Sequence, residues 1–288
     1  MSAPRFGKPR IAIVGAGNLA GALAPSLQAA GYAIDEIVSR GPGPSLQRAR
    51  ALAREVAAAA VVVSRARLRA EIVWFCIPDG EIAKAVKSLT DAVDWNNKIA
   101  FHSSGALTSD VLAVLRNRGA SVASLHPLMT FVPGSRPALV GAPFAIEGDT
   151  KAARTARALV LNLHGQAFPI RKEQKVAYHA WGMFASPLLT ALLAATERVA
   201  AAAGVSQSAA RKRMFPILNQ TLVNYANLGA PGSFSGPIRR GDIDTVKKHL
   251  NVLRGVPGAR DVYVALARVA LRDLPANNRT ALEKIINR

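Results

Sequence analysis

A short apolar run at residues 11–14, IAIV, passes directly into the glycine-rich segment GAGNLAG at residues 15–21. A β-strand that leads into G-x-G-x-x-G/A and opens a helix is typical of a dinucleotide-binding site. The first glycine permits a tight turn, the second lets the backbone approach a pyrophosphate, and a small third residue lets the helix pack on the strand. The residues predicted to contact a dinucleotide here are Gly15, Gly17, Asn18, Leu19 and Ala20. The alternative is a glycine turn with only a structural role.

The next β-rich run, at about residues 33–39, ends at Ser39 and Arg40. NAD enzymes usually place an acidic residue near this position, where it binds the ribose 2′-hydroxyl. Asp35 and Glu36 come too early in the strand to do so. A serine hydroxyl and a guanidinium suit a 2′-phosphate instead, so the sequence predicts NADP as the cofactor. The alternative is a solvated surface arginine, since the chain has 37 Lys and Arg.

Further β-rich runs alternate with helical or loop segments up to Ile170, at residues 59–63, 71–77, 98–103, 121–127, 138–148 and 166–170. Such alternation predicts an α/β domain with a parallel sheet covered on both faces. After Ile170 the pattern is helical, at about 172–203, 206–228, 243–254 and 259–273, with a short helix at the end. We therefore expect a doubly wound Rossmann sheet in residues 1–170, followed by an all-α substrate or dimerisation domain in residues 171–288.

Polar residues follow several of these strands, and ligands of doubly wound sheets bind beyond the carboxyl ends of the strands. Ile77 and Pro78 end the fourth strand and are predicted to line the cofactor. The later strand ends and the helix that follows supply the candidates for the chemical site: His102, Ser103, Ser104, His126 and His179. Histidine exchanges protons near neutral pH, so His179, or secondarily His102, is the expected general acid. Ser103 is the third catalytic candidate, and Ser104 and His126 are expected to bind substrate.

Other chemistries fit these residues less well. A metal site of three histidines is disfavoured because they lie far apart in sequence, and no metal is predicted. Ser103 lacks the nucleophile-elbow pattern of acyl-transfer enzymes. In the loop at residues 236–242, GPIRRGD, Arg240 is a candidate ligand for an anionic substrate group. Alternatively, Arg240 and Asp242 only fix the loop, with Asp242 capping the next helix.

The net charge of +19 raises the question of nucleic-acid binding, but 19 basic residues lie in residues 1–170 and 18 in residues 171–288. Such even spreading, with 6% aromatic residues, argues against a specific nucleic-acid site.

The single cysteine, Cys76, is expected to be buried and inert. The N-terminal segment has no apolar stretch typical of a signal peptide, so a cytoplasmic location is expected. Residues 176–196 lack charged side chains and are interpreted as a buried core helix rather than a membrane span.

Six segments together resemble predicted oxidoreductases that join a Rossmann-like domain to an uncharacterised helical domain: GAGNLAGAL, CIPDGEI, FHSSGAL, SLHPLMTF, YHAWGMFAS and GPIRRGDIDTVKKHL. The resemblance covers nearly the whole chain. The layout is similar to that of the 6-phosphogluconate dehydrogenase superfamily, which includes pyrroline-5-carboxylate reductase and ketopantoate reductase. It implies a helical domain that often dimerises and an active site between the domains.

Superfamily reductases commonly use Lys and Asn from the first long helix near the substrate. The family often has Asn after the FAS motif, where this chain has Pro187, and no Lys is found within residues 176–196. His179 is therefore the expected proton donor. The chain is predicted to be an NADPH-dependent reductase of a small carbonyl or imine compound and to act as a homodimer. The substrate is expected to carry a carboxylate, and a ketopantoate-like compound is one candidate. The alternatives are a deazaflavin-linked NADP oxidoreductase and a non-catalytic NADP sensor.

Overall fold

The computed structural model describes residues 7–287 and divides into two compact units, residues 1–183 and 184–288. The first six residues of the N-terminal segment lie outside the described residues. The predicted domain boundary at 170/171 marks the end of the strand–helix alternation. The first compact unit extends to Met183 because the helix after that point bonds to strand ends of the sheet through Lys175 and Tyr178.

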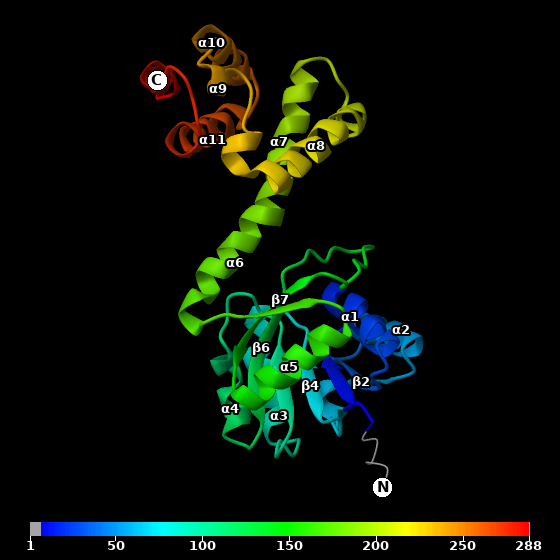
Figure 1. Ribbon diagram of the computed structural model, residues 1–288. Coiled ribbons are helices and arrows are strands. Elements are labelled where there is room, and N and C mark those ends of the chain that lie inside the picture. The colour runs from blue at the N-terminus through cyan, green and yellow to red at the C-terminus, as the bar shows by residue number, and fades with distance from the viewer. Residues whose placement is uncertain (1–6, 288) are drawn as a thin grey trace. The chain divides into compact units, whose positions relative to one another are not determined.

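The first unit is built on one eight-stranded sheet (Figure 1), as the alternation predicts. Its strands are β1 (Ile11–Val14), β2 (Ile34–Ser39), β3 (Ala59–Val62), β4 (Ile72–Phe75), β5 (Ile99–His102), β6 (Ser121–Pro127), β7 (Pro143–Gly148) and β8 (Gln166–Pro169). The order is β3-β2-β1-β4-β5-β6-β7-β8. All neighbours pair in parallel except β6 and β7, which are antiparallel. The order of the first six strands is that of a Rossmann fold, whose direction of winding reverses between β1 and β4.

Helices cover both faces of this sheet. They are α1 (Asn18–Ala29), α2 (Pro44–Glu55), α3 (Asp79–Thr90), α4 (Ala113–Arg116) and α5 (Thr150–Asn162). The last helix of the unit, α6 (Lys175–Met183), follows β8 and covers neither face. Alternate side chains of a strand point to opposite faces. In β1, Ile11 and Ile13 pack in one core with α1, α2 and α5, whereas Ala12 and Val14 pack in a second core with α3. The strands are thus buried on both faces, as in other parallel sheets.

The second unit consists of helices. They are α7 (Leu189–Ala202), α8 (Gln207–Ser233), α9 (Pro237–Arg240), α10 (Ile243–Val252), α11 (Ala259–Asp273) and α12 (Arg279–Ile286). Gly229 has φ +67° and kinks α8. The helix resumes after the kink and ends at Ser233, inside the stretch 230–242 that was predicted to be a loop. A π-helical turn, Phe184–Leu188, contains Pro187. Proline lacks a backbone N–H, and such defects accompany local departures from regular α-helix.

The prediction of a buried helix at residues 176–196 is wrong for the single chain. The helical stretch Lys172–Ala202 is long and apolar enough to cross a membrane by length and composition, which is weak evidence by itself, and 6% of its most apolar window is buried. Trp181 is 57% exposed and Phe184 72% exposed. The apolar composition therefore does not serve the core of the described chain, and a cytoplasmic location stays a prediction.

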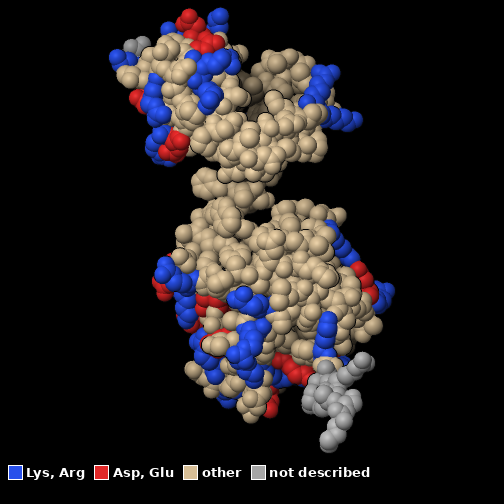
Figure 2. Space-filling view, in the orientation of Figure 1, with Lys and Arg blue, Asp and Glu red and all other residues tan. Residues whose placement is uncertain are grey.

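Lys and Arg are distributed over both units. On the face shown in Figure 2 they form several separate groups, with acidic side chains among them and uncharged surface between. Among residues 7–287, some of these basic side chains form ion pairs with carboxylates, such as Arg10 with Asp35 and Arg116 with Asp149. The absence of a specific nucleic-acid site stays a prediction.

Candidate functional site

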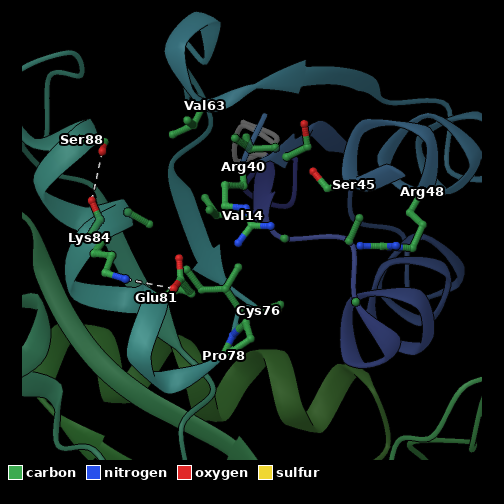
Figure 3. Close-up of a pocket in the computed structure, with 17 residues that line it drawn as sticks. Val14, Arg40, Ser45, Arg48, Val63, Cys76, Pro78, Glu81, Lys84 and Ser88 are labelled. Atoms are coloured by element: carbon green, nitrogen blue, oxygen red, sulfur yellow. Dashed lines mark hydrogen bonds and ion pairs between the residues drawn. The ribbon is translucent and has the colours of Figure 1, made fainter. Parts of the chain in front are cut away.

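A cavity of about 540 Å³ opens at the carboxyl ends of β1, β2 and β4, where the winding of the sheet reverses (Figure 3). Ligands of doubly wound sheets bind at this point. The predicted cofactor residues that line the cavity are Gly15, Gly17, Ser39, Arg40, Ile77 and Pro78. The geometry thus gathers into one cavity residues that lie up to 63 positions apart in the sequence.

The two glycines of the first turn meet different constraints. Gly15 has φ +113°, and a Cβ there would lie 2.4 Å from the carbonyl oxygen of Cys76, so the fold itself requires glycine. A Cβ on Gly17 would have no atom within 4 Å. Since Gly17 lines the cavity, its missing side chain leaves space that the protein does not fill. That space fits a group bound against the backbone.

The helix after this turn offers unpaired donors. No side chain caps the N-terminus of α1. The N–H groups of a helix's first turn lack intrahelical partners and attract anions. Ala20 is fully buried in the core, so it can reach a ligand only through its backbone, and Leu19 beside it is partly buried. Asn18 donates its side-chain amide to the carbonyl of Phe131, which holds the loop after β6 beside the turn.

The end of β2 only partly matches the prediction. Ser39 is 3% exposed, and its hydroxyl lies within hydrogen-bond distance of the carbonyls of Gly41 and Val61, which leaves no proton for a phosphate. Arg40 is exposed and lines the cavity. Arg48 of α2 also lines it, and Figure 3 shows both guanidinium groups directed into the central space. Neither arginine forms an ion pair with any residue in 7–287.

Arg48 was missed in the sequence, although a signal exists. It lies one helical turn after Ser45 in the helix that follows Arg40, and Ser45 lines the same cavity. Arg48 also borders a second cavity of about 500 Å³, between the starts of α1 and α2 and the loop that carries Val132 and Arg136. In that loop Arg136 pairs with Glu55 at 2.5 Å. Arg48 and Arg136 therefore both line this second cavity, beside the first turn of α1.

His102 does not have the properties of a general acid. Its side chain is fully buried, its Nδ1 accepts the N–H of Ser104, and its Nε2 lies 3.1 Å from the carbonyl of Thr108. Burial, reinforced by the positive charge of Lys175, lowers the pKa of His102 to about 3. The ring is therefore neutral and both nitrogens are occupied. This geometry favours a structural role for His102, which fixes the loop after β5, over the predicted catalytic role.

The hydroxyls of the two serines after His102 also form hydrogen bonds within the protein. Ser103 Oγ accepts the indole N–H of Trp74 at 2.7 Å. Ser104 is 3% exposed; its hydroxyl donates to Asp79 at 2.7 Å and accepts the N–H groups of Ala106 and Leu107. This geometry favours structural roles for both serines over the predicted contacts with substrate. Cys76 is buried as expected, and burial raises its pKa to about 12, so its thiol is unreactive.

Lys175 is the main residue that sequence reasoning missed. It begins α6, one turn before His179, so the spacing of four places both on one helix face. Its side chain is 1% exposed, and its ammonium donates to the carbonyl of Ser104 at 3.0 Å and to the hydroxyl of Ser124. Burial lowers the pKa of Lys175 to about 8. Lys175 directly precedes residues 176–196, in which sequence reasoning found no lysine.

His126 and His179 come together beside Gly105. Their ring centroids are 6.3 Å apart, and the rings are nearly perpendicular. A Cβ on Gly105 would lie 2.6 Å from Cδ2 of His179 and 3.0 Å from Nε2 of His126, so only glycine lets the loop approach both rings. Both histidines are partly exposed. Among residues 7–287, no group of three or more His, Cys, Asp and Glu is arranged to hold a metal ion.

Arg240 ends α9 in the second unit and is exposed. The neighbouring Asp242 caps α10 by accepting the N–H and the hydroxyl of Thr245. These bonds hold the pKa of Asp242 below its usual value. The capping role is thus confirmed for Asp242, and a substrate contact from Arg240 stays a prediction.

Two sequence profiles match the chain. Residues 2–127 match a Rossmann-like domain, and residues 142–270 match a domain of unknown function, DUF2520. The chain joins a Rossmann-like domain to a DUF2520 domain. The matched DUF2520 region includes Lys175, Tyr178 and His179. The family resemblance and the fold class predicted from the sequence are confirmed.

Solved structures share this two-domain layout. One is a Bacteroides fragilis protein with the provisional name NADP oxidoreductase (22% identity, 91% of this chain and 97% of that chain, TM-score 0.77). Another is an imine reductase from Pseudomonas sp. (21% identity, 97% and 99%, TM-score 0.64). A third is a reductive aminase from Aspergillus terreus in complex with NADPH and ethyl-5-oxohexanoate (14% identity, 96% and 99%, TM-score 0.65). No curated protein matches significantly. At these identities the likeness concerns the fold alone.

Proposed function

We propose that this Rossmann–DUF2520 protein is an NADPH-dependent oxidoreductase that reduces a small carbonyl or imine compound. The observation that carries the proposal is the cavity at the first turn of the sheet. It combines unfilled space over Gly17 with two arginines, Arg40 and Arg48, that form no ion pair with residues 7–287. The reductive aminase named above shares the fold and binds NADPH, which supports the same cofactor here.

The residues of the cavity fit the parts of NADPH. The uncapped start of α1 suits the pyrophosphate. Arg40, with Arg48 beside it, suits the 2′-phosphate, since a guanidinium can bind phosphate through two parallel hydrogen bonds. Ile77 and Pro78 offer an apolar edge near the end of β4. When bound, the reduced nicotinamide supplies the hydride.

His179 is the best candidate for the proton donor. His102 is neutral and fully hydrogen-bonded, and the buried ammonium of Lys175 is held by Ser104 and Ser124. His179 is partly exposed beside Gly105, and neither of its ring nitrogens has a hydrogen-bond partner among residues 7–287. It can therefore reach a substrate, whereas Lys175 acts through the loop that it holds.

The test is NADPH oxidation by the full-length protein over a panel of small carbonyl and imine compounds, with NADPH binding measured separately. We expect His179→Ala to lower turnover about 100-fold or more, because a general acid contributes this much, and to leave NADPH binding unchanged. His164→Asn is the matched control, since His164 is exposed at φ +56°, a conformation that asparagine tolerates. Undiminished turnover in His179→Ala would contradict the assignment. NADPH binding without turnover of any compound would favour the non-catalytic sensor.

We also propose that the chain forms a homodimer through the second unit. Helix α8 exposes large apolar side chains along its length: Phe215, Ile217, Leu222, Tyr225 and Leu228, each 59% exposed or more. Exposed apolar patches of this kind mark interaction surfaces in soluble proteins. A second copy of the chain would bury them.

A further inference from the structure

The phenol of Tyr178 lies 2.7 Å from Nδ1 of His126. The two rings meet edge to face, with centroids 5.4 Å apart and an interplanar angle of 88°. Tyr178 comes from α6 and His126 from the end of β6. Tyr178 is 6% exposed, so its hydroxyl is enclosed by the protein.

This contact selects one tautomer of His126. A buried hydroxyl proton needs an acceptor, and the acceptor that the structure gives Tyr178 is Nδ1 of His126. If Nδ1 carried the proton instead, the buried phenol would accept it and its own proton would lack a partner. Burial also raises the pKa of Tyr178, so the phenol stays protonated, and burial lowers the pKa of His126 to about 4, so the ring stays neutral. The proton of the neutral ring is then on Nε2.

The Nε2 of His126 lies against the backbone of Gly105, with the ring of His179 nearby. The two rings fill the position that a Cβ of residue 105 would take, so only glycine lets this loop pack against both. Among residues 7–287, Nε2 has no hydrogen-bond partner, and it is not one of the unpartnered atoms that are sealed from solvent. It is therefore a fixed donor that a ligand can reach.

The donor character of this N–H favours an acceptor oxygen over a cation. The ammonium of Lys175 donates to the carbonyl of Ser104, and the negative charges of Glu147 and Asp79 act on the same ammonium. The buried charges therefore largely offset one another. A carbonyl oxygen has lone pairs that can accept the Nε2–H, whereas the nitrogen of an iminium has none.

We propose that His126, held as the Nε2–H tautomer by Tyr178, donates a hydrogen bond to the carbonyl oxygen of the substrate, which is a ketone rather than an iminium. This inference rests on the proposed function. Bound NADPH would supply a hydride to the carbonyl carbon, and the π electron pair would pass to the oxygen, which would take a proton from His179. The products are an alcohol and NADP⁺, and water returns the proton to His179. Tyr178 is a positioning residue, since it acts through His126.

The test uses full-length protein with ¹⁵N-labelled histidine, whose NMR spectra distinguish the two tautomers, and His126→Gln assigns the signals. The spectra are recorded with NADPH alone, then with oxamate, a carbonyl and carboxylate probe, or with pyrrolidine, a cationic probe. We expect the Nε2–H tautomer, a shift of the His126 Nε2 signal on adding oxamate, and no shift with pyrrolidine. Tyr178→Phe should yield a mixture of tautomers and weaken oxamate binding about tenfold, the effect of losing one fixed hydrogen bond.

The outcomes separate the two proposals, because NADPH binding is read in the same samples from nicotinamide fluorescence. Failure of NADPH to bind would overturn the proposed function. NADPH binding together with an Nδ1–H tautomer, an unchanged His126 signal with oxamate, or a preference for pyrrolidine would overturn this inference alone. Phe168→Leu is the control for packing, since Phe168 also contacts the Tyr178 ring edge-on and has no polar atom. An equal loss of the tautomer in this variant would show that packing, and not the phenol, sets it.

Discussion

Lys175 is the most buried charged residue among residues 7–287. Its side chain is 1% exposed, and two acceptors hold its ammonium, the carbonyl of Ser104 and the hydroxyl of Ser124. Moving an ammonium from water into a protein is unfavourable unless partners replace its hydration. In return, the charge fixes the loop after β5 to the end of β6. The neutral states of His102 and His126 follow in part from the same charge.

This burial predicts a pH dependence of stability. The pKa of Lys175 falls from 10.5 in the unfolded chain to about 8 in the fold. Between these values the unfolded chain holds the proton and the folded chain does not, so the free energy of unfolding rises with pH. We expect a gain of up to about 1.4 kcal/mol per pH unit relative to Lys175→Met. Urea unfolding of both proteins between about pH 8 and 10.5 measures it, and parallel pH curves would contradict the burial of the charge.

The difficulty of predicting single residues is clear from His102. The sequence places it correctly at the end of a strand, but not the N–H of Ser104 and the carbonyl of Thr108 that take up its two nitrogens. Both bonds depend on how the following loop folds back. The partner of Ser103 was likewise not visible in the sequence, because Trp74 is 29 residues away. Lys175 could have been found from its spacing of four to His179.

At the scale of elements, the turn between β1 and α1 combines a structural glycine with one that leaves space for a ligand. Gly15 is packed against Cys76 of β4, and Gly17 faces the cavity. The sequence predicted this element well because its glycine spacing is a local property. The strands were predicted for the same reason, since β1, β4 and β5 are short, apolar and buried on both faces.

The two glycines should therefore respond differently to the same substitution. Gly15→Ala should lower the free energy of unfolding by about 2 kcal/mol or more, because the Cβ would lie 2.4 Å from a carbonyl oxygen at φ +113°. Gly17→Ala should leave stability nearly unchanged and weaken NADPH binding, because its Cβ would enter free space in the cavity. Thermal unfolding with and without NADPH measures both effects. Unchanged NADPH binding in Gly17→Ala would place the ligand elsewhere.

At the scale of the whole molecule, the excess of apolar surface on the helices is the feature that the sequence could not place. The stretch at 176–196 was interpreted as core because it lacks charge, yet its window is 6% buried. An apolar composition predicts that a segment is buried, but it does not show whether the same chain or another chain buries it. The same ambiguity applies to α8, where Phe215 and Ile217 are each 68% exposed.

The dimer proposal gives a direct prediction for this scale. We expect sedimentation of the wild-type protein at about twice the chain mass of 30.4 kDa. Phe215→Glu combined with Leu222→Glu should yield a monomer, because two buried charges at an interface oppose association. Val114→Glu in α4 is the matched control, since Val114 is an apolar side chain that is 50% exposed in the first unit. A wild-type monomer at all concentrations would contradict the proposal.

The central claim is that the cavity at the first turn binds NADPH through Arg40. The most direct measurement is a titration of the protein with NADPH and NADH side by side, followed by nicotinamide fluorescence. We expect selective binding of NADPH, and a loss of about tenfold to hundredfold in Arg40→Ala with the weaker NADH binding unchanged, because one charge-assisted phosphate contact is removed. Arg50→Ala, which removes an exposed charge from α2 outside the cavity, should change neither affinity. Equal binding of the two nucleotides by the wild-type protein, or an Arg40→Ala variant that keeps the full wild-type preference for NADPH, would contradict the account.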